Sequence, residues 1–584
     1  MRKYVVPASG LVLALLLGVG WIGYRGNQAR GHLGAAAQLF VQLKQQVESG
    51  DAGSAKRTLV SLRRETDAAR DETAGPAWSI GTVLPKVGDD MAAARTIAAS
   101  LDLLADDGLP PLLDAASGLE AAVLAPKNGR IDLAALRQAA PSIAKANAVI
   151  TNVRARIAAI PTKDLDASIA TRIPQLLSAL QRAEQLAGPA SRAMTLLPSM
   201  LGADGPRTYL LIFQNLAEMR ATGGMPGAYI VIKADHGDIS VIDQGTATGM
   251  RTFATPVVPL DPDLVDLHTE RIATFPADVD LSPDFPTAAT VIREMYRLRS
   301  GHTVDGVIST DPVALSYLLR ATGPVAIPGH AQLTAGTAVK QLLNDVYLRM
   351  PDNATQDAYF SAVARAVFNA LFAQHGDPRA EVAALARSAG ERRLLVWSAH
   401  PEEQQEIATT VLAGTLPADD GARPTVGVFL NDGTGAKLGY YVRRSVSLTA
   451  AGCLEDGTRE LRLKVTLTST APKSGLPFSV TGLALGGPGN IVRTNVMIYS
   501  PTGGAAVDTK LNGADTDVGL GVEKGRAVSV VTVDLAPGQT ATVETGLITG
   551  SLPGSVGAFT PRLITTPAVT PWTTAITSGP ACKK

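Results

Sequence analysis

The residues best suited to chemistry lie between Asn215 and Gly227, where the sequence reads NLAEMRATGGMPG between two apolar runs that we expect to be strands. Arg220 precedes the pair Gly223 and Gly224. Glycines let backbone N–H groups converge, and a guanidinium beside them completes a pocket for a phosphate or pyrophosphate. The alternative is an ordinary turn with positive φ angles at the glycines, in which Arg220 pairs with Glu218. The segment predicts one of these two arrangements.

A second polar group is the acidic stretch FPADVDLSPDFP at residues 275–286. Its carboxylates Asp278, Asp280 and Asp284 are suited to holding a hard cation through oxygen ligands. The other interpretation is that Asp284 caps a helix beginning near Thr287, while the other two acids face solvent. The sequence leaves both interpretations open.

Further candidates lie at the ends of expected elements. Asp311 follows the apolar run at residues 304–310, and sites in open sheets collect at such strand ends. It also precedes a proline, as helix caps often do. We name Glu218 and Asp311 as candidate general bases. Arg251 and Arg365 are candidate partners of a leaving pyrophosphate, and the alternative for Arg365 is a surface ion pair.

Several classes of function are disfavoured by composition and by missing signatures. The chain has 53 basic and 53 acidic residues among 584, so it lacks the surplus of cations that a general nucleic-acid binder needs. It contains no GxSxG, GxxxxGK[ST], GxGxxG or HExxH motif. Two cysteines exclude a four-thiolate zinc site within the chain.

The elements that must position these candidates change in character along the chain. Residues 26–204 are rich in Ala and Leu at helical spacing, which predicts a stalk or bundle of helical hairpins. Residues 205–420 alternate apolar strands with helices, which predicts an α/β/α domain. Residues 421–584 carry short β-branched runs between turns, which predicts an immunoglobulin-like β-sandwich. The fold class expected is therefore multidomain α+β.

An apolar segment precedes these domains. Residues 5–22 carry no charge, and eighteen helical residues cover about 27 Å, close to the thickness of a bilayer core. Trp21 and Tyr24 stand at its end, where aromatic rings favour the membrane interface. A small-residue cleavage site does not follow promptly. We expect residues 1–25 to be an uncleaved transmembrane anchor in the plasma membrane.

The two cysteines bear on the side of the membrane. Cys453 and Cys582 flank the strand-rich region, and a disulfide between them would indicate an oxidising compartment. The alternative is two unrelated thiols. We expect the bulk of the chain to lie outside the cytoplasm.

The chain resembles the bacterial family called domain of unknown function 4012. The resemblance is carried by NLAEMRATGGMPGAYIVIKADHGDIS, FPADVDLSPDFPTAATVIREMY, VDGVISTDPVALSYLLRATGPV, LTAGTAVKQLLNDVY and VFLNDGTGAKLGYYVRRSV, within residues 30–584. It implies an anchored extracytoplasmic protein that is often encoded among envelope-polysaccharide functions. It carries no established activity.

The central domain also resembles, more distantly, the LytR-CpsA-Psr transferases, which move glycopolymers from polyprenyl-pyrophosphate carriers to the cell wall. This resemblance implies that Arg220 and Arg365 contact pyrophosphate and that Mg²⁺ is a cofactor. The family's Arg-Ser-Asp-Thr stretch reads RATG at residues 220–223, and its Arg-Asp-Thr stretch is nearest to residues 251–252. The acid of both stretches is absent here.

Two functions follow as expectations. The first is a membrane-anchored protein that binds a polyprenyl-phosphate-linked glycan and assists its transfer to a cell-wall polymer, with Arg220, Gly223, Gly224, Arg251 and Arg365 near the phosphates. The second is a non-catalytic envelope scaffold or glycan-binding protein.

Overall fold

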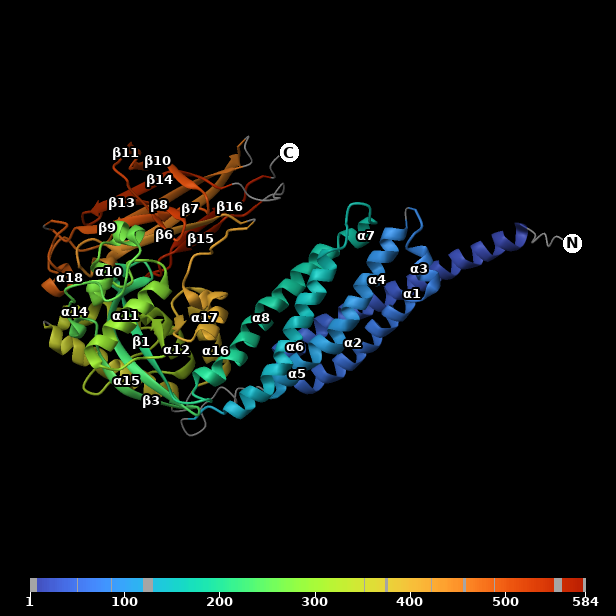
Figure 1. The fold of residues 1–584 in the computed structure, drawn as a ribbon, viewed down its shortest axis with the longest axis horizontal. Coiled ribbons are helices and arrows are strands. Elements are labelled where there is room, and N and C mark those ends of the chain that lie inside the picture. Colours follow the sequence, from blue (N-terminus) through green and yellow to red (C-terminus); the bar gives the residue numbers. More distant parts are fainter. Residues whose placement is uncertain are drawn as a thin grey trace. The chain divides into compact units, whose positions relative to one another are not determined.

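Helices account for the N-terminal part of the chain, as the spacing of Ala and Leu predicts (Figure 1). Leu59 and Leu62 of the second helix pack with Leu43 of the first in one buried cluster. The last of these helices contains Pro189 and Pro198 and continues through both. The helices are α1 (Ala8–Glu48), α2 (Ala52–Glu72), α3 (Pro76–Gly81), α4 (Gly88–Leu103), η1 (Leu104–Gly108), α5 (Leu109–Gly118), α6 (Leu133–Ala158), α7 (Ala167–Ala170) and α8 (Ile173–Met200).

The chain divides into two units after residue 204. The first comprises residues 1–127 and 131–204, and the second comprises residues 128–130 and 205–584. The computed structural model describes residues 8–49, 51–85, 87–118, 130–350, 352–372, 376–421, 423–454, 458–487, 489–550 and 559–580.

The expected membrane anchor and disulfide fall partly outside the described residues. Residues 1–7 of the expected anchor are not described, and α1 begins at Ala8. Within the described ranges, no helix combines the length and the apolar character that a membrane crossing requires. Cys453 ends its strand, while Cys582 lies outside the described residues. The anchor and the disulfide stay predictions.

The second unit contains a five-stranded sheet that carries most of the candidate residues. Its order is β3-β2-β1-β4-β5; β1 and β4 run parallel, and the other neighbours are antiparallel. β1 and β2 are long and nearly continuous in apolar residues because helices cover both faces of the sheet. The strands are β1 (Arg207–Arg220), β2 (Gly223–Asp235), β3 (Asp238–Thr246), β4 (Gly306–Thr310) and β5 (Leu395–Ser398).

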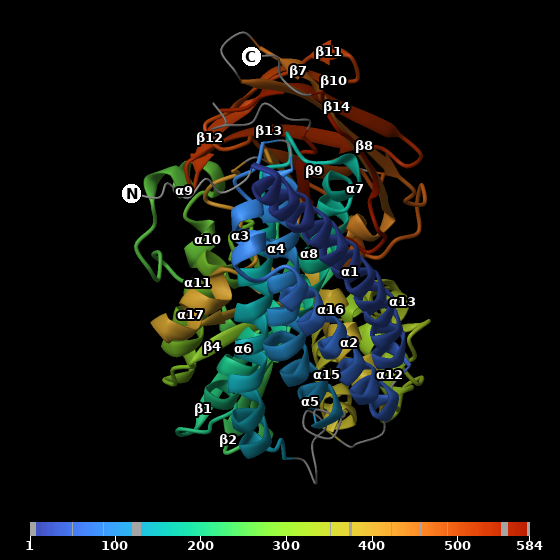
Figure 2. The same cartoon turned by 90° about the vertical axis from the view of Figure 1, so that its right-hand side faces the viewer.

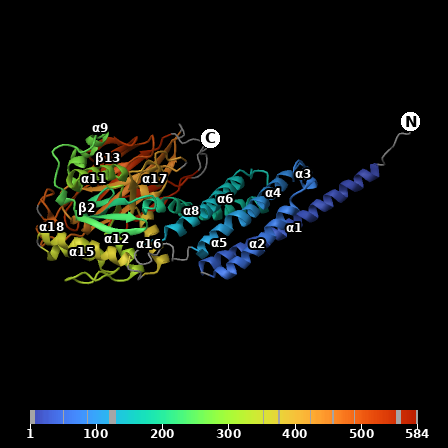
Figure 3. The same ribbon diagram turned by 60° about the horizontal axis from the view of Figure 1, so that its bottom comes forward.

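Different helices cover the two faces of this sheet. Figure 3 shows α11 on one side of β2, with α12 and α15 on the other. Ile292 of α11 belongs to a core cluster with Leu210 of β1, whereas Leu315 of α12 belongs to a second cluster. The elements are η2 (Thr248–Met250), α9 (Pro262–His268), α10 (Arg271–Thr274), η3 (Pro276–Asp278), α11 (Phe285–Ser300), α12 (Pro312–Thr322), α13 (Ala338–Lys340), η4 (Gln341–Asp345), α14 (Val346–Arg349), α15 (Asn353–Phe372), α16 (Pro378–Gly390), α17 (Pro401–Ala408) and η5 (Val411–Ala413).

Beyond residue 421 the second unit forms two further sheets, which appear as two layers in Figure 2. One has the order β11-β10-β14-β8-β7-β16 and the other β12-β13-β9-β6-β15. The elements are β6 (Thr425–Asp432), η6 (Leu438–Tyr441), β7 (Val442–Cys453), β8 (Arg459–Ser469), α18 (Phe478–Thr481), β9 (Val492–Tyr499), β10 (Ala505–Leu511), β11 (Ala514–Asp515), β12 (Gly519–Glu523), β13 (Arg526–Leu535), β14 (Thr540–Ile548), β15 (Arg562–Thr565) and β16 (Thr573–Thr577).

One hydrophobic core joins the helix-covered sheet to the two-sheet region. Val428 of β6 and Val465 of β8 belong to the same buried cluster as Leu315 of α12 and Val363 of α15. Residues 205–420 and 421–584, which the sequence predicts as separate domains, therefore share a core within one unit. The coarse prediction of a mixed α+β fold is confirmed.

A buried arginine fixes the connection between these two parts. Arg526 of β13 donates to Asp420 at 2.6 Å and to the carbonyl oxygens of Thr425 and Ser500 at 3.1 and 3.0 Å. The side chains of Arg526 and Asp420 are each 2% exposed. Burial opposes ionisation of Asp420, but the hydrogen bonds from Arg526 and from backbone N–H groups, together with the charge of Arg526, outweigh it and lower the pKa of this carboxyl.

We expect Arg526→Met to lower the free energy of unfolding by about 3–5 kcal/mol, because it leaves the buried Asp420 carboxylate without its cation. The matched control is Arg493→Met, which removes the more exposed pair with Asp534 and a hydrogen bond to the carbonyl oxygen of Leu485, and which should cost far less stability. Urea unfolding of the detergent-solubilised protein measures both values. Equal losses for the two variants would contradict this interpretation of the Arg526 contacts.

Candidate functional site

The β1–β2 hairpin carries the segment that the sequence singles out. Its register moves from the pair Asn215–Met225 to the pair Met219–Gly224, so three residues of β1 bulge out of the ladder. Gly223 has a φ of +147°. A Cβ on Gly224 would lie 2.1 Å from the carbonyl oxygen of Asn215. The glycines are therefore needed for the close approach of the two strands, and Gly224 donates its N–H to the side chain of Gln214 at 3.4 Å.

Arg220 is buried at the tip of this hairpin among carboxylates. Its Nη2 donates to Glu218 Oε1 and to Asp278 Oδ1, both at 2.9 Å. Its Nη1 donates to the carbonyl oxygen of Met219 at 3.0 Å. Burial alone would lower the pKa of Arg220, but the charges of Glu218 and Asp278 outweigh it and raise that pKa. The alternative pairing of Arg220 with Glu218 is present in the structure, with Asp278 as a second partner.

The acids around Arg220 do not form a metal site. Asp278 is held on its other oxygen by Arg271 at 2.8 Å. Asp280 accepts from Thr222 at 3.1 Å. In the part of the chain that is described, no group of three or more acidic, His or Cys side chains is arranged for a metal ion. A guanidinium lies where a cation would be held, so the residues do not fit the Mg²⁺ that the transferase resemblance implies.

Asp284 and Asp311 are both helix caps. Asp284 accepts from the backbone N–H of Thr287 at 3.2 Å at the start of α11. Asp311 Oδ1 accepts from the N–H groups of Val313 and Ala314 at 2.8 Å, and its Oδ2 accepts from Arg393 at 2.8 Å. Burial raises the pKa of Asp311 despite the charge of Arg393. Both oxygens of this candidate base are therefore engaged.

The other two candidate arginines have separate surroundings. Arg251 follows η2 with a φ of +60° and is exposed. Arg365 lies on the exposed side of α15 and donates to Gln244 Oε1 at 2.8 Å. It lines an open groove between α15 and β3. The structure therefore does not bring the guanidiniums of Arg220, Arg251 and Arg365 to one pocket.

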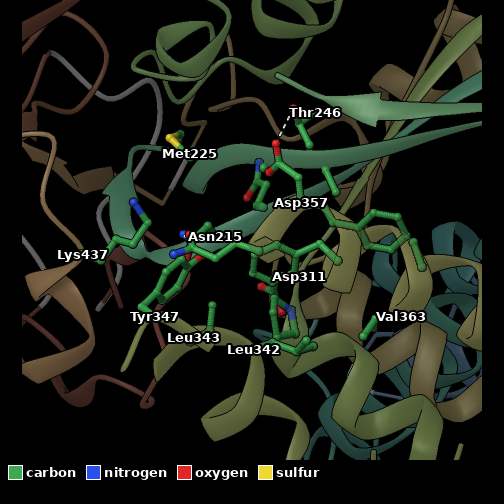
Figure 4. Close-up of a pocket in the computed structure, with 18 of the residues that line it drawn as sticks. Asn215, Met225, Thr246, Asp311, Leu342, Leu343, Tyr347, Asp357, Val363 and Lys437 are labelled. Atoms are coloured by element: carbon green, nitrogen blue, oxygen red, sulfur yellow. Dashed lines mark hydrogen bonds between the residues drawn. The ribbon is translucent and has the colours of Figure 1, made fainter. Parts of the chain in front are cut away.

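A cavity does lie beside the hairpin, between the sheet and the helices α12 and α15 (Figure 4). Its volume is about 200 Å³. A π-helical turn, η4, forms part of the wall, and such turns are frequent at functional sites. The apolar lining comes from β1, β2, α12, η4 and α15, through Phe213, Met225, Leu315, Leu342, Leu343, Phe360, Val363, Ala364 and Val367.

Polar groups gather at two edges of this cavity. At one edge Asn215 donates to the hydroxyl of Tyr347 at 2.8 Å, and Lys437 lies over the ring of Tyr347 at 5.1 Å. At the other edge Thr246 and Asp357 line both the cavity and the groove that holds Arg365. Burial raises the pKa of Asp357, and the hydrogen bond from Thr246 offsets part of this effect.

Lys437 and Asp357 belong to no motif that predicts a functional site from the sequence. Lys437 stands in the turn after β6, more than two hundred residues from the hairpin, and its Nζ lies 3.5 Å from Glu218 Oε2. Asp357 is a single acid in the second turn of α15, and no motif surrounds it. The sequence feature that could have pointed to Lys437 is its place within VFLNDGTGAKLGYYVRRSV, one of the stretches that resemble the family.

Asp432 provides a test of the buried acidic cluster. Burial and the charge of Glu218 raise its pKa to about 6 from an ordinary 3.8. The native state thus binds this proton more tightly than the unfolded chain. Its stabilising effect is complete below about pH 4 and is lost as the pH rises through about 6. Each tenfold change in proton affinity is about 1.4 kcal/mol, so the effect is about 3 kcal/mol.

We expect Asp432→Asn to remove this part of the pH dependence. The side-chain oxygen of Asn still accepts from the N–H groups of Thr434, Gly435 and Ala436, as Asp432 does, but Asn does not titrate. The free energy of unfolding should then fall by about 3 kcal/mol less between pH 4 and pH 7 than in the unchanged protein. Urea titrations across this range measure the difference. Asp432→Glu, which keeps a carboxyl group, should retain the dependence, and identical profiles for all three proteins would refute the assignment.

In a comparison with known protein families, part of the chain matches one family model. Residues 204–347 match the family model described as "Protein of unknown function (DUF4012)". This range holds the β1–β2 hairpin, Arg220, Asp311 and Tyr347, and it is shorter than the range over which the sequence resembles the family. No curated protein matches the chain, and neither does any solved structure. The chain thus carries the DUF4012 region, in agreement with the resemblance seen in its sequence.

Proposed function

We propose that this protein is a membrane-anchored, extracytoplasmic component of cell-envelope glycopolymer assembly, and that it binds the lipid end of a polyprenyl-phosphate-linked glycan. The observation that carries the proposal is the apolar cavity between the sheet and α12 and α15, with the ammonium group of Lys437 at its edge. A cavity with apolar walls and a few polar groups at its rim is the usual form of a small-molecule site.

The size and lining of the cavity suit part of an aliphatic chain. A volume of about 200 Å³ corresponds to roughly fifteen water-sized spheres. That space accepts a short stretch of an isoprenoid chain and is too small for an oligosaccharide. The aromatic rings of Phe213 and Phe360 and the aliphatic side chains of Leu342 and Val363 provide contacts without hydrogen-bonding demands. We therefore assign the chain, and not the sugar, to this cavity.

Lys437 is the cation that we assign to the phosphate. Its side chain is 18% exposed, so its ammonium group is partly removed from water but still reachable. A charge-assisted hydrogen bond to phosphate is stronger under these conditions than at a fully exposed site. Glu218, at 3.5 Å, compensates the lysine only in part, because Glu218 is also bound by Arg220.

We propose binding and presentation of the lipid-linked glycan rather than its transfer. Glu218 and Asp311, the candidate bases, are each buried and paired with an arginine. Both oxygens of Asp311 already accept hydrogen bonds, and the two oxygens of Glu218 lie beside Arg220 and Lys437. The acids of the transferase-like stretches are also absent at residues 220–223 and 251–252. The central LytR-CpsA-Psr-like fold remains a part of the proposal that rests on sequence resemblance.

A scaffold function is favoured by a separate observation. β16 ends its sheet, and all five of its residues are exposed. An unpaired edge of this kind accepts a strand from another chain. In this second proposal the region from residue 421 onward is an immunoglobulin-like module, stabilised by Cys453 and Cys582, that binds a partner in the envelope.

The lipid proposal predicts that filling the cavity blocks binding. We expect Ala364→Phe to weaken binding of a polyprenyl phosphate at least tenfold, because displacing two CH₂-sized groups costs about 1.6 kcal/mol. Native mass spectrometry of the detergent-extracted protein with added polyprenyl phosphate measures the occupied fraction. The control is Ala354→Phe, which adds the same ring to an exposed position of α15. Equal occupancy in both variants would refute the cavity as the site.

The assignment of the phosphate to Lys437 predicts a difference between charged and neutral lipids. We expect Lys437→Gln to weaken polyprenyl phosphate binding at least about tenfold, because a hydrogen bond to a charged group contributes about 1.5–3 kcal/mol. Binding of the uncharged polyprenol should be unchanged. Arg365→Gln is the comparison variant, and a loss there with none in Lys437→Gln would place the phosphate in the groove beside α15.

A further inference from the structure

The segment at residues 472–487, here named the apolar loop, exposes large hydrophobic side chains. Phe478 is 71% exposed, Leu483 is 69% exposed and Leu485 is 58% exposed. Soluble surfaces rarely gather such side chains within eight residues unless the patch meets another apolar phase. The loop contains the short helix α18, which packs near α14 (Figure 1).

The exposure of these side chains is not the result of a loosely attached loop. Val480 is buried at 2% exposure and accepts at its carbonyl oxygen from the N–H of Lys437 at 2.8 Å. Ser479 donates to the carbonyl oxygen of Tyr347 at 2.9 Å. Gly482 has a φ of +58°, and a Cβ there would lie 2.6 Å from the carbonyl oxygen of Gly435. The loop is fixed on its inner side while its apolar side chains face outward.

The charged residues of the segment that contains the apolar loop are basic. Residues 470–507 contain no Asp or Glu. Lys473 is exposed within the loop. Arg493 donates to the carbonyl oxygen of Leu485 at 3.2 Å and pairs with Asp534. Exposed apolar side chains flanked by a cation, without acids in the same segment, complement a surface of anionic phospholipid.

We infer that the apolar loop inserts into the surface of a lipid bilayer, through Phe478, Leu483 and Leu485. A protein partner needs about 800 Å² on each side for a stable complex, more than three side chains supply. Insertion into a bilayer interface requires only a few apolar side chains and a neighbouring cation. A bilayer is therefore the occupant that the size and charge of the patch favour.

The position of the loop supports the same occupant. The two residues that hold it, Tyr347 and Lys437, form the polar edge of the cavity (Figure 4). A loop inserted in the bilayer would bring this edge to the level of the phospholipid head groups. The inference goes beyond the proposed function and does not require that the cavity be occupied.

The test uses the full chain in proteoliposomes of phosphatidylcholine and phosphatidylglycerol with brominated acyl chains, which quench tryptophan on contact. We expect the additional emission of Phe478→Trp, relative to the unchanged protein, to be quenched by more than half. The matched control is Leu520→Trp on β12, at a site that is 80% exposed, and its additional emission should not be quenched.

Each other outcome overturns the inference. Absence of quenching at residue 478, or equal quenching at residues 478 and 520, would show that the loop does not insert. The emission of Phe478→Trp could instead shift to the blue as the protein-to-lipid ratio rises, without being quenched. That result would identify a second copy of the chain as the occupant. Quenching should persist when Phe478→Trp is combined with Ala364→Phe, because insertion of the loop does not depend on the cavity. Failure of the cavity proposal and failure of the loop inference therefore give different results.

Discussion

A buried charge has to be compensated by opposite charges or by hydrogen bonds, and Arg220 imposes this requirement on the centre of the second unit. Its partners come from two places in the chain: Glu218 on the same strand and Asp278 on η3. Removing one member of such a cluster leaves an uncompensated charge in a medium that solvates it poorly. The hairpin tip is consequently fixed relative to the segment at residues 275–284 and, through Ala221 and Asn431, to β6.

The cavity depends on that fixed hairpin. The bulge in β1 moves the strand out of register just where Asn215 turns toward Tyr347. The π-helical turn η4 places Leu342 and Leu343 on the facing wall. Neither feature is a regular ladder or helix, and irregular backbone of this kind persists only when its surroundings over-determine it. Here the neighbours are the buried charges on one side and the shared hydrophobic core on the other.

Lys437 contacts the buried acidic cluster, the edge of the cavity and the apolar loop. Its side chain reaches Glu218 and the ring of Tyr347, and its backbone N–H holds the apolar loop. A phosphate bound at the cavity edge and a bilayer bound at the apolar loop would therefore contact neighbouring parts of the same region. The cations expected to meet a pyrophosphate have other roles, since Arg220 stabilises the core and Arg365 lies on the far side of α15 from the apolar wall.

Local patterns in the sequence determined the helices of the first unit, the strands around Arg220 and the cap at Asp311. Each of these depends on residues within about four positions, through helical periodicity, turn chemistry or a side chain that bonds the next backbone N–H. The pairing of Arg220 with Glu218 was visible for the same reason, because the partners are two residues apart. Only the tertiary structure decided that Asp278 completes the cluster, that Lys437 meets Tyr347 and that an apolar cavity lies beside them. Those contacts join segments 58 to more than 200 residues apart, where packing of a common core and not local propensity selects the neighbours.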